Sequence, residues 1–195
     1  MIVDYQNDFT PGGALGVAEA LVIVDYQNDF NPGGALAVPE GDLIAARINA
    51  LAADPRFDLV VATRDWHPPG HGSFTEQGGV WPVHCIQESE GAELAPGLDR
   101  AGIDVIVDKG QDSGTDGYSG FDGTNLAEML RERGIDTLTV VGLATDYCVK
   151  HTAIEAAGEG FGVRVERDAM RGVDVEPGDS ERAIEDMRAA GVEVS

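Results

Sequence analysis

Residues 21–30, LVIVDYQNDF, join an apolar run to an abruptly polar stretch. The run at residues 21–24 suits a strand that is buried on both faces, which is typical of a parallel sheet covered by helices. Ligands of such sheets bind at the carboxyl ends of the strands, and Asp25 follows this strand directly. A partly buried carboxylate there has a raised pKa and suits proton transfer. Taken alone, Asp25 is equally well interpreted as a turn cap.

The rest of the chain alternates apolar runs with helical patterns. We expect further strands at residues 59–63, 105–107, 138–141, 163–165 and 192–194, and helices at residues 41–51, 125–133, 146–157 and 180–190. Strands that alternate with helices predict the α/β class. The expected structure is a single-domain, three-layer α/β/α fold of the Rossmann-like kind, with a mainly parallel six-stranded sheet.

The N-terminal part contains a duplication. Residues 2–17 read IVDYQNDFTPGGALGV and residues 23–38 read IVDYQNDFNPGGALAV. Only the second copy is preceded by further apolar residues and runs directly into an expected helix, so we assign the strand and the chemistry to it. We expect residues 1–19 to be a duplicated extension, poorly ordered or exchanged with a neighbouring molecule, and residues 20–195 to form the domain. The opposite assignment would put Asp4 in the place of Asp25.

The charge is strongly negative: 35 acidic residues face 13 basic ones, a net charge of -22. Nucleic acids and anionic membrane surfaces repel such a polyanion, so neither is expected as a partner. No apolar segment approaches the roughly 20 residues that cross a bilayer, and no signal peptide is evident, which predicts a cytoplasmic protein. The scattered acidic groups suggest a host with a salty cytoplasm, where salt screens their repulsion. An acidic protein from an ordinary host is the alternative.

Cys148 and Lys109 each follow an expected strand. Cys148 lies near the start of the helix expected at residues 146–157, whose positive field and free N–H groups would lower the thiol pKa and form an oxyanion hole. A buried core cysteine is the alternative. Lys109, one of two lysines, could orient a carboxylate and a thiolate, although a single lysine is usually a surface residue. Cys85 lacks such a setting and is interpreted as structural.

Three of the four histidines fall in the long loop region after the strand at residues 59–63. Asp65 and His67 are two apart in extended chain, so both side chains can point the same way, and His84 can complete the set. Two imidazoles and a carboxylate suit Zn²⁺, Fe²⁺ or Mn²⁺. His71 is interpreted as a further ligand or as a partner of one. Histidines scattered over the loop without a ligand role are the alternative.

Together these segments resemble the nicotinamidase/pyrazinamidase branch of the isochorismatase-like cysteine hydrolases. The matching segments keep the family's order from residue 20 onward: VIVDYQNDF with PGGAL (22–36), ATRDWHPPGHGSF (62–74), WPVHCIQ with GAEL (81–94), DKG and YSGF (108–121) and VVGLATDYCVKHTA (140–153). The resemblance implies an isochorismatase-like hydrolase fold. It also implies hydrolysis of a linear amide C–N bond, with nicotinamide, and also pyrazinamide, as the small-molecule substrate.

The resemblance further implies the roles of particular residues. The implied catalytic triad is Asp25, Lys109 and Cys148. The implied ligands of one divalent metal ion, for which Zn²⁺ ranks first and Fe²⁺ and Mn²⁺ are alternatives, are Asp65, His67 and His84, with His71 nearby. The oxyanion hole would be the backbone N–H groups of Ala144 and Cys148, beside a cis peptide between Leu143 and Ala144. The aromatic substrate slot would be formed by Phe30, Trp81, Tyr118 and Tyr147.

In the implied mechanism the metal binds the ring nitrogen of nicotinamide, and the thiolate of Cys148 attacks the carboxamide carbon. Asp25 takes the thiol proton and gives it to the departing ammonia, after which water hydrolyses the thioester to nicotinate. Lys109 holds Asp25 and stabilises charge.

Three other functions compete with this one. A related hydrolase of the same fold would act on another small amide, a carbamoyl amine or isochorismate. A dinucleotide-binding domain is disfavoured, because no GxGxxG follows the strand at residues 21–24. A non-catalytic binding protein is disfavoured because all the triad and metal candidates are present. The sequence does not define the oligomeric state, and a homo-oligomer is compatible with it.

Overall fold

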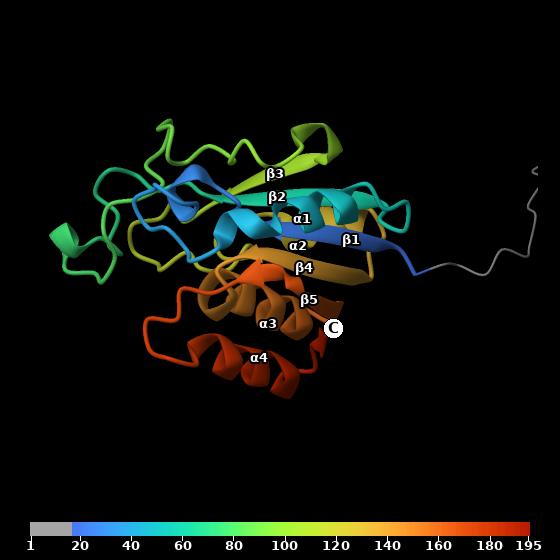
Figure 1. Ribbon diagram of the computed structural model, residues 1–195. Coiled ribbons are helices and arrows are strands. Elements are labelled where there is room, and N and C mark those ends of the chain that lie inside the picture. The colour runs from blue at the N-terminus through green and yellow to red at the C-terminus, as the bar shows by residue number, and fades with distance from the viewer. Residues whose placement is uncertain (1–16) are drawn as a thin grey trace, which may run out of the picture.

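A computed structural model describes residues 17–195 (Figure 1). The expected exchange or disorder of the N-terminal extension falls almost wholly outside the described residues. Six strands form one sheet in the order β3-β2-β1-β4-β5-β6. These strands are β1 (Glu19–Val24), β2 (Leu59–Asp65), β3 (Val105–Lys109), β4 (Thr137–Leu143), β5 (Gly162–Arg171) and β6 (Glu193–Val194). Every pairing in the sheet is parallel, so the predicted fold class is confirmed.

Helices cover both faces of the sheet, which gives the three predicted layers. The helices are α1 (Ala45–Ala52), α2 (Leu126–Glu132), α3 (Lys150–Gly158) and α4 (Asp179–Ala189). In Figure 1, α1 crosses in front of the sheet and α2 lies behind it. The apolar residues of α1 belong to one core cluster, and those of α2, α3 and α4 belong to a second.

The central strand β1 divides its side chains between these two cores. Leu21 and Ile23 pack in the core of α1, whereas Val22 and Val24 pack in the core of α2, α3 and α4. All four are fully buried, as the uninterrupted apolar run predicts. Each aliphatic side chain buried in this way stabilises the fold by about 1.5–3 kcal/mol. The second copy of the duplicated motif therefore supplies the centre of the sheet.

Two of the predicted helices begin with turns of a different kind. The segment predicted as a helix at residues 41–51 opens with a 3-10 turn at Gly41–Ile44 before α1. The segment predicted as a helix at residues 146–157 opens with a π turn at Thr145–Val149 before α3. π turns are rare and occur often at functional sites. Cys148 lies within this π turn.

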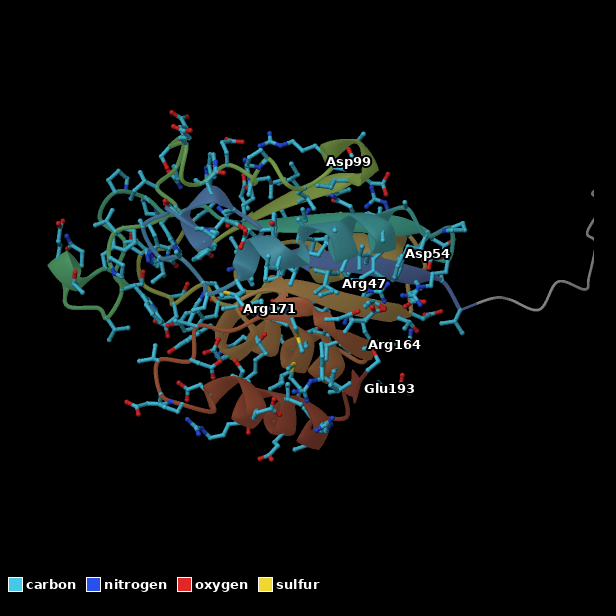
Figure 2. All side chains as sticks on the ribbon, viewed as in Figure 1. Arg47, Asp54, Asp99, Arg164, Arg171 and Glu193 are labelled. Atoms are coloured by element: carbon cyan, nitrogen blue, oxygen red, sulfur yellow. The ribbon has the colours of Figure 1, made fainter. Side chains whose placement is uncertain are left out.

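Strands β4 and β5 are longer than predicted. Gly142 suggested the end of β4, but it remains in the strand with a φ of 115°, next to a register shift against β5. The polar residues from Glu166 onward suggested the end of β5. Instead Glu166 is buried and bonds to two arginines, Arg47 and, at 2.9 Å, Arg56. Figure 2 shows Arg47 among the side chains in front of the sheet.

The chain leaves β1 towards β2 and β3 on one side and returns to β4 on the other. The reversal of strand order on either side of β1 leaves a crevice at the carboxyl ends, where such sheets bind ligands. The long connections after β2 and β3 gather at that end of the sheet (Figure 1). None of the helices within residues 17–195 combines the length and the apolar character that crossing a membrane requires.

Candidate active site

Lys109 connects three strand ends in the crevice. Its Nζ lies 2.8 Å from Asp25 Oδ2, 2.5 Å from Asp65 Oδ1 and 3.5 Å from Cys148 Sγ. It also donates to the carbonyl of Gly117 at 2.9 Å. Lys109 is only 1% exposed and Asp25 is fully buried. The three residues implied as a catalytic triad are therefore in mutual contact through one ammonium group.

Each member of this group is placed by the end of a strand. Lys109 is the last residue of β3, and Asp25 follows β1 with a positive φ of 49°. The Thr63 hydroxyl in β2 donates to Asp25 Oδ1 at 2.7 Å, which fixes the direction of the carboxylate. Cys148 comes from the π turn after β4. The signal in the sequence was the position of each residue after an apolar run: directly after it for Asp25, one residue later for Lys109, and at the start of the following helix for Cys148.

Burial dominates the electrostatics of the triad. Burial raises the pKa of Asp25, although the charge of Lys109 opposes the shift. Burial alone would lower the pKa of Lys109, but Asp25 and Asp65 outweigh it and hold that pKa well above its usual range. The Lys109 side chain therefore stays charged. The predicted rise in the pKa of Asp25 is confirmed.

The prediction for the Cys148 thiol is wrong in direction. Burial raises the pKa of Cys148 well above its usual range, and the nearby charges of Asp25 and Asp65 raise it further, while Lys109 alone opposes them. The expected lowering by a helix start is outweighed because the sulfur is removed from water and faces two carboxylates. A proton acceptor is needed before this sulfur can attack, and Asp25 is the neighbouring group with that capacity.

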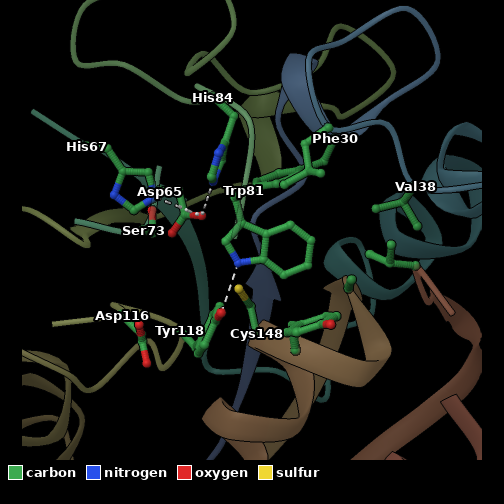
Figure 3. A pocket seen from close by; sticks show the side chains of 14 residues that line it. Phe30, Val38, Asp65, His67, Ser73, Trp81, His84, Asp116, Tyr118 and Cys148 are labelled. Atoms are coloured by element: carbon green, nitrogen blue, oxygen red, sulfur yellow. Dashed lines mark hydrogen bonds and ion pairs between the residues drawn. The ribbon is translucent and has the colours of Figure 1, made fainter. Parts of the chain in front are cut away.

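Asp65, His67 and His84 form a second cluster beside the triad. One ligand atom from each lies within 4.8 Å of the others. The Nε2 atoms of His67 and His84 lie 3.4 Å and 3.8 Å from Asp65 Oδ2. Figure 3 shows both imidazoles directed at this carboxylate. The sequence predicted this set from the spacing of the first two members.

The hydrogen bonds of the two imidazoles fit them for a metal ion. His67 Nδ1 lies 2.8 Å from the carbonyl of Gly110, and His84 Nδ1 lies 2.8 Å from the carbonyl of Pro82. A carbonyl only accepts, so each Nδ1 carries the proton and each Nε2 presents a lone pair to the cluster. Asp65 adds an anionic oxygen; burial raises its pKa, but the charge of Lys109 opposes burial and the pKa stays well below its usual range. Two neutral imidazoles and a carboxylate suit a divalent cation.

His71 is adjacent to this cluster but offers it no nitrogen. Its Nδ1 is 2.8 Å from Ser73 Oγ and its Nε2 is 3.1 Å from the carbonyl of Asp112. Its ring stacks on His67 with the centroids 4.0 Å apart. Of the two roles considered for His71, the geometry matches a partner that packs against a ligand. His151, the remaining histidine, stacks on Tyr118.

A cavity opens onto both clusters. The four residues expected in an aromatic slot all line it: Phe30, Trp81, Tyr118 and Tyr147. The Trp81 indole donates to the Tyr118 hydroxyl at 2.9 Å (Figure 3). The Trp81 ring also meets the Tyr147 ring edge to face. The mostly apolar walls of the cavity, with a few polar groups, are typical of a site for a small molecule.

The expected cis peptide bond lies in the cavity wall near Cys148. Ala144 and Cys148 both line the cavity, and the peptide bond between Leu143 and Ala144 is cis, as predicted. Ala144 lies at the start of the π turn that carries Cys148. The two residues implied as the oxyanion hole thus share one wall of the cavity.

Several residues of the site were not found from the sequence. The sequence predicts only that Thr63 ends a strand and that Asp116 belongs to a loop. In the structure, Thr63 orients Asp25 and Asp116 lines the cavity. Gln27 was noted only as polar, although it is fully buried beside Asp65. Their partners lie far away in the chain, so periodicity and spacing carry no signal for these contacts.

Comparisons with known proteins identify the family of the chain. The isochorismatase domain family matches residues 19–195. The nicotinamidase of Escherichia coli is 45% identical over 98% of this chain and 91% of that protein. The nicotinamidase/pyrazinamidase of Mycobacterium tuberculosis is 43% identical over 100% of this chain and 96% of that protein. The structure of the pyrazinamidase of Pyrococcus horikoshii in complex with zinc superposes with a TM-score of 0.84 and 46% identity, covering 91% of this chain and 98% of that one.

Proposed function

The chain belongs to the isochorismatase family, and we propose that it is a nicotinamidase that also accepts pyrazinamide. It is a hydrolase that acts on an amide C–N bond. The observation that carries the proposal is the cavity that joins Cys148, with its Lys109 and Asp25 partners, to the Asp65, His67 and His84 cluster. In the proposed complex the flat ring lies between the aromatic walls and its carboxamide faces the sulfur of Cys148.

The charge of the cavity favours an uncharged amide as the substrate. Among the residues that line the cavity, none is an arginine or a lysine, and Asp65 and Asp116 are acidic. Lys109 lies behind Cys148 and is already bonded to two carboxylates. A substrate that carries its own carboxylate would find no arginine or lysine in the cavity wall, and only the divalent cation proposed below would oppose its charge. Nicotinamide and pyrazinamide are neutral and satisfy this condition.

Cys148, Asp25 and Lys109 divide the covalent chemistry between them. Asp25 accepts the thiol proton as Cys148 Sγ bonds to the carboxamide carbon, and the backbone N–H groups of Ala144 and Cys148 stabilise the oxygen that becomes negative. Asp25 returns the proton to the leaving nitrogen as the C–N bond breaks, which releases ammonia. Asp25 then takes a proton from the water that attacks the thioester carbon. The C–S bond breaks, Asp25 returns this proton to the Cys148 sulfur, and the acid product leaves and loses its own proton to solvent. Lys109 stays charged throughout and holds Asp25 beside the sulfur.

Asp65, His67 and His84 are the proposed ligands of one divalent cation, Zn²⁺ first and Fe²⁺ or Mn²⁺ as alternatives. When bound, the cation supplies a Lewis acid at the cavity wall that accepts the ring nitrogen of the substrate. The aromatic residues that line the cavity orient the ring. The free thiols of Cys85 and Cys148 accord with the expected cytoplasmic location.

Ammonia release from nicotinamide, with Zn²⁺ supplied, tests the proposed function. The wild type is expected to release ammonia, and Cys148→Ala is expected to lose at least about 10³-fold in kcat. The control is Cys85→Ala, which removes the other buried cysteine and should keep most of the activity. A folded wild type with no activity on nicotinamide or pyrazinamide would overturn the proposed substrates. An active Cys148→Ala would overturn the proposed nucleophile.

A further inference from the structure

Strand β1 ends before its neighbour β2 does. The last pair of the β1–β2 ladder is Ile23 with Ala62, whereas β2 continues to Asp65. The backbone N–H of Asp25 still donates to the carbonyl of Thr63 at 3.3 Å. The main chain that follows β1 then turns away from β2. The backbone of Asp65 thus needs partners on this side that the strand no longer supplies.

The side chain of Gln27 supplies those partners. Its Oε1 accepts from the backbone N–H of Asp65 at 2.8 Å, and its Nε2 donates to the carbonyl of Asp65 at 2.8 Å. Nε2 also donates to the carbonyl of Ala92 at 2.8 Å. Gln27 is fully buried. Its amide therefore acts as a substitute peptide group that extends the ladder by one residue, at the point where Asp65 presents its carboxylate.

Fixing both sides of the Asp65 backbone fixes the direction of its carboxylate. That carboxylate contacts Lys109 through Oδ1 and the two histidines through Oδ2. On the other side β3 holds β2, with Asp65 opposite Lys109 in the ladder. A rotation of Asp65 would move the metal ligand and the partner of Lys109 together.

Asp29 performs a similar task for the segment that carries His84. Its Oδ2 accepts from the backbone N–H of Cys85 at 2.7 Å, and its Oδ1 accepts from Ala35 at 3.2 Å. Cys85 has a φ of 45°, a conformation that residues with a side chain rarely adopt, so an external bond is needed to hold it. The carbonyl of Cys85 then accepts from the backbone N–H of His67 at 2.9 Å.

We propose that Gln27 and Asp29 are positioning residues that set the spacing of Asp65, His67 and His84 and thereby the affinity for the divalent cation. The inference rests on the metal ligands named in the proposed function. Neither residue lines the substrate cavity, so each acts through the residues it holds. Partners of metal ligands commonly change metal affinity by 10- to 100-fold when they are replaced.

The test is the Zn²⁺ affinity of Gln27→Met, measured by competition with a chromophoric chelator at a temperature where circular dichroism shows a folded protein. Met keeps the length of the side chain and removes the amide. We expect affinity to fall about 10- to 100-fold, and kcat to fall with little change in KM. The matched control is Asn49→Leu. Asn49 also bonds the main chain on two sides, at Gly97 and Asp99, but in α1 and away from the ligands.

Asn49→Leu is expected to lose some stability and to keep its Zn²⁺ affinity within about twofold. A folded Gln27→Met with wild-type Zn²⁺ affinity would overturn the role of Gln27. If Gln27→Met does not fold, Asp29→Asn carries the test, since it keeps the size of the side chain but turns one acceptor into a donor facing an N–H group. Unchanged affinity in folded Asp29→Asn would overturn the proposal. A wild type that binds no Zn²⁺ but hydrolyses nicotinamide would overturn the metal site and leave the cysteine mechanism in place.

Discussion

A single buried ammonium group neutralises the centre of the site. Lys109 lies between Asp25 and Asp65, and burying two carboxylates without it would cost several kcal/mol. The arrangement explains how a charged residue is retained at 1% exposure. It also links the nucleophile to the metal ligands, because the same Nζ contacts Cys148 Sγ and Asp65.

Lys109→Met is expected to destabilise the fold by about 3–5 kcal/mol, because it leaves two carboxylates buried side by side without a cation. Urea unfolding with metal removed by a chelator measures this. The control is Lys150→Met at the only other lysine, which lies 3.8 Å from the largely exposed Asp186. A surface pair of this kind contributes less than about 1 kcal/mol. Equal losses in the two variants would contradict this account of Lys109.

Asp116→Asn is expected to slow release of the product. Hydrolysis turns a neutral amide into an anion in a cavity that Asp116 borders and that no lining arginine or lysine neutralises. Repulsion of about 1 kcal/mol corresponds to roughly a 5-fold tighter inhibition by nicotinate in the variant at low salt. The effect should shrink at 1 M NaCl, where screening is strong. Asp112→Asn, in the same exposed loop but outside the cavity, is the control; a matching change there would argue against a local effect.

At the level of the elements, the sequence predicted which segments form strands and helices but not where β4 and β5 end. Apolar runs such as that of β1 mark the strands, because burial on both faces leaves no polar positions. Gly142 and Glu166 misled the prediction, since a left-handed glycine inside a strand and a buried ion pair both depend on partners elsewhere in the fold. The triad and metal residues were predicted by their positions after strands. Gln27, Thr63 and Asp29 were not, because their roles exist only in the folded contacts.

Gly142→Ala is expected to destabilise the protein by several kcal/mol. A methyl group at Gly142 would lie 2.1 Å from the carbonyl oxygen of Val24, and the φ of 115° is itself unfavourable for alanine. The strand that carries Asp25 would have to move away from β4. Gly158→Ala at the end of α3 meets nothing within 4 Å and should be neutral or stabilise the helix by up to about 1 kcal/mol. Comparable thermal unfolding of both variants would refute this interpretation.

On the scale of the whole molecule, the net charge of -22 makes the folded state repel itself. Surface ion pairs partly oppose this, for example Arg164 with Glu193 at 3.3 Å (Figure 2). Each such pair contributes less than about 1 kcal/mol, so the unpaired excess of acidic groups decides the response to salt. Screening the excess should stabilise the protein more than the loss of the pairs destabilises it.

The free energy of unfolding is therefore expected to rise between 0.05 M and 2 M NaCl, with an increase of several degrees in Tm. Urea unfolding at both salt concentrations measures it. Chloride is used because sulfate would also strengthen hydrophobic burial and hide the electrostatic part. Equal stability at the two concentrations would remove the support for an adaptation to a salty cytoplasm.

The position of β1 at the centre of the sheet has a consequence for synthesis on the ribosome. Leu21 pairs with Val60 on one side and with Thr139 on the other, so the most apolar strand is translated long before its second neighbour. Until β4 emerges from the exit tunnel, one full edge of β1 has no partner in the nascent chain, and long-range parallel pairing forms slowly. Nascent chains arrested while β4 is still inside the exit tunnel should be bound by chaperones or aggregate, whereas chains long enough to expose Leu143 outside the tunnel can close the centre of the sheet.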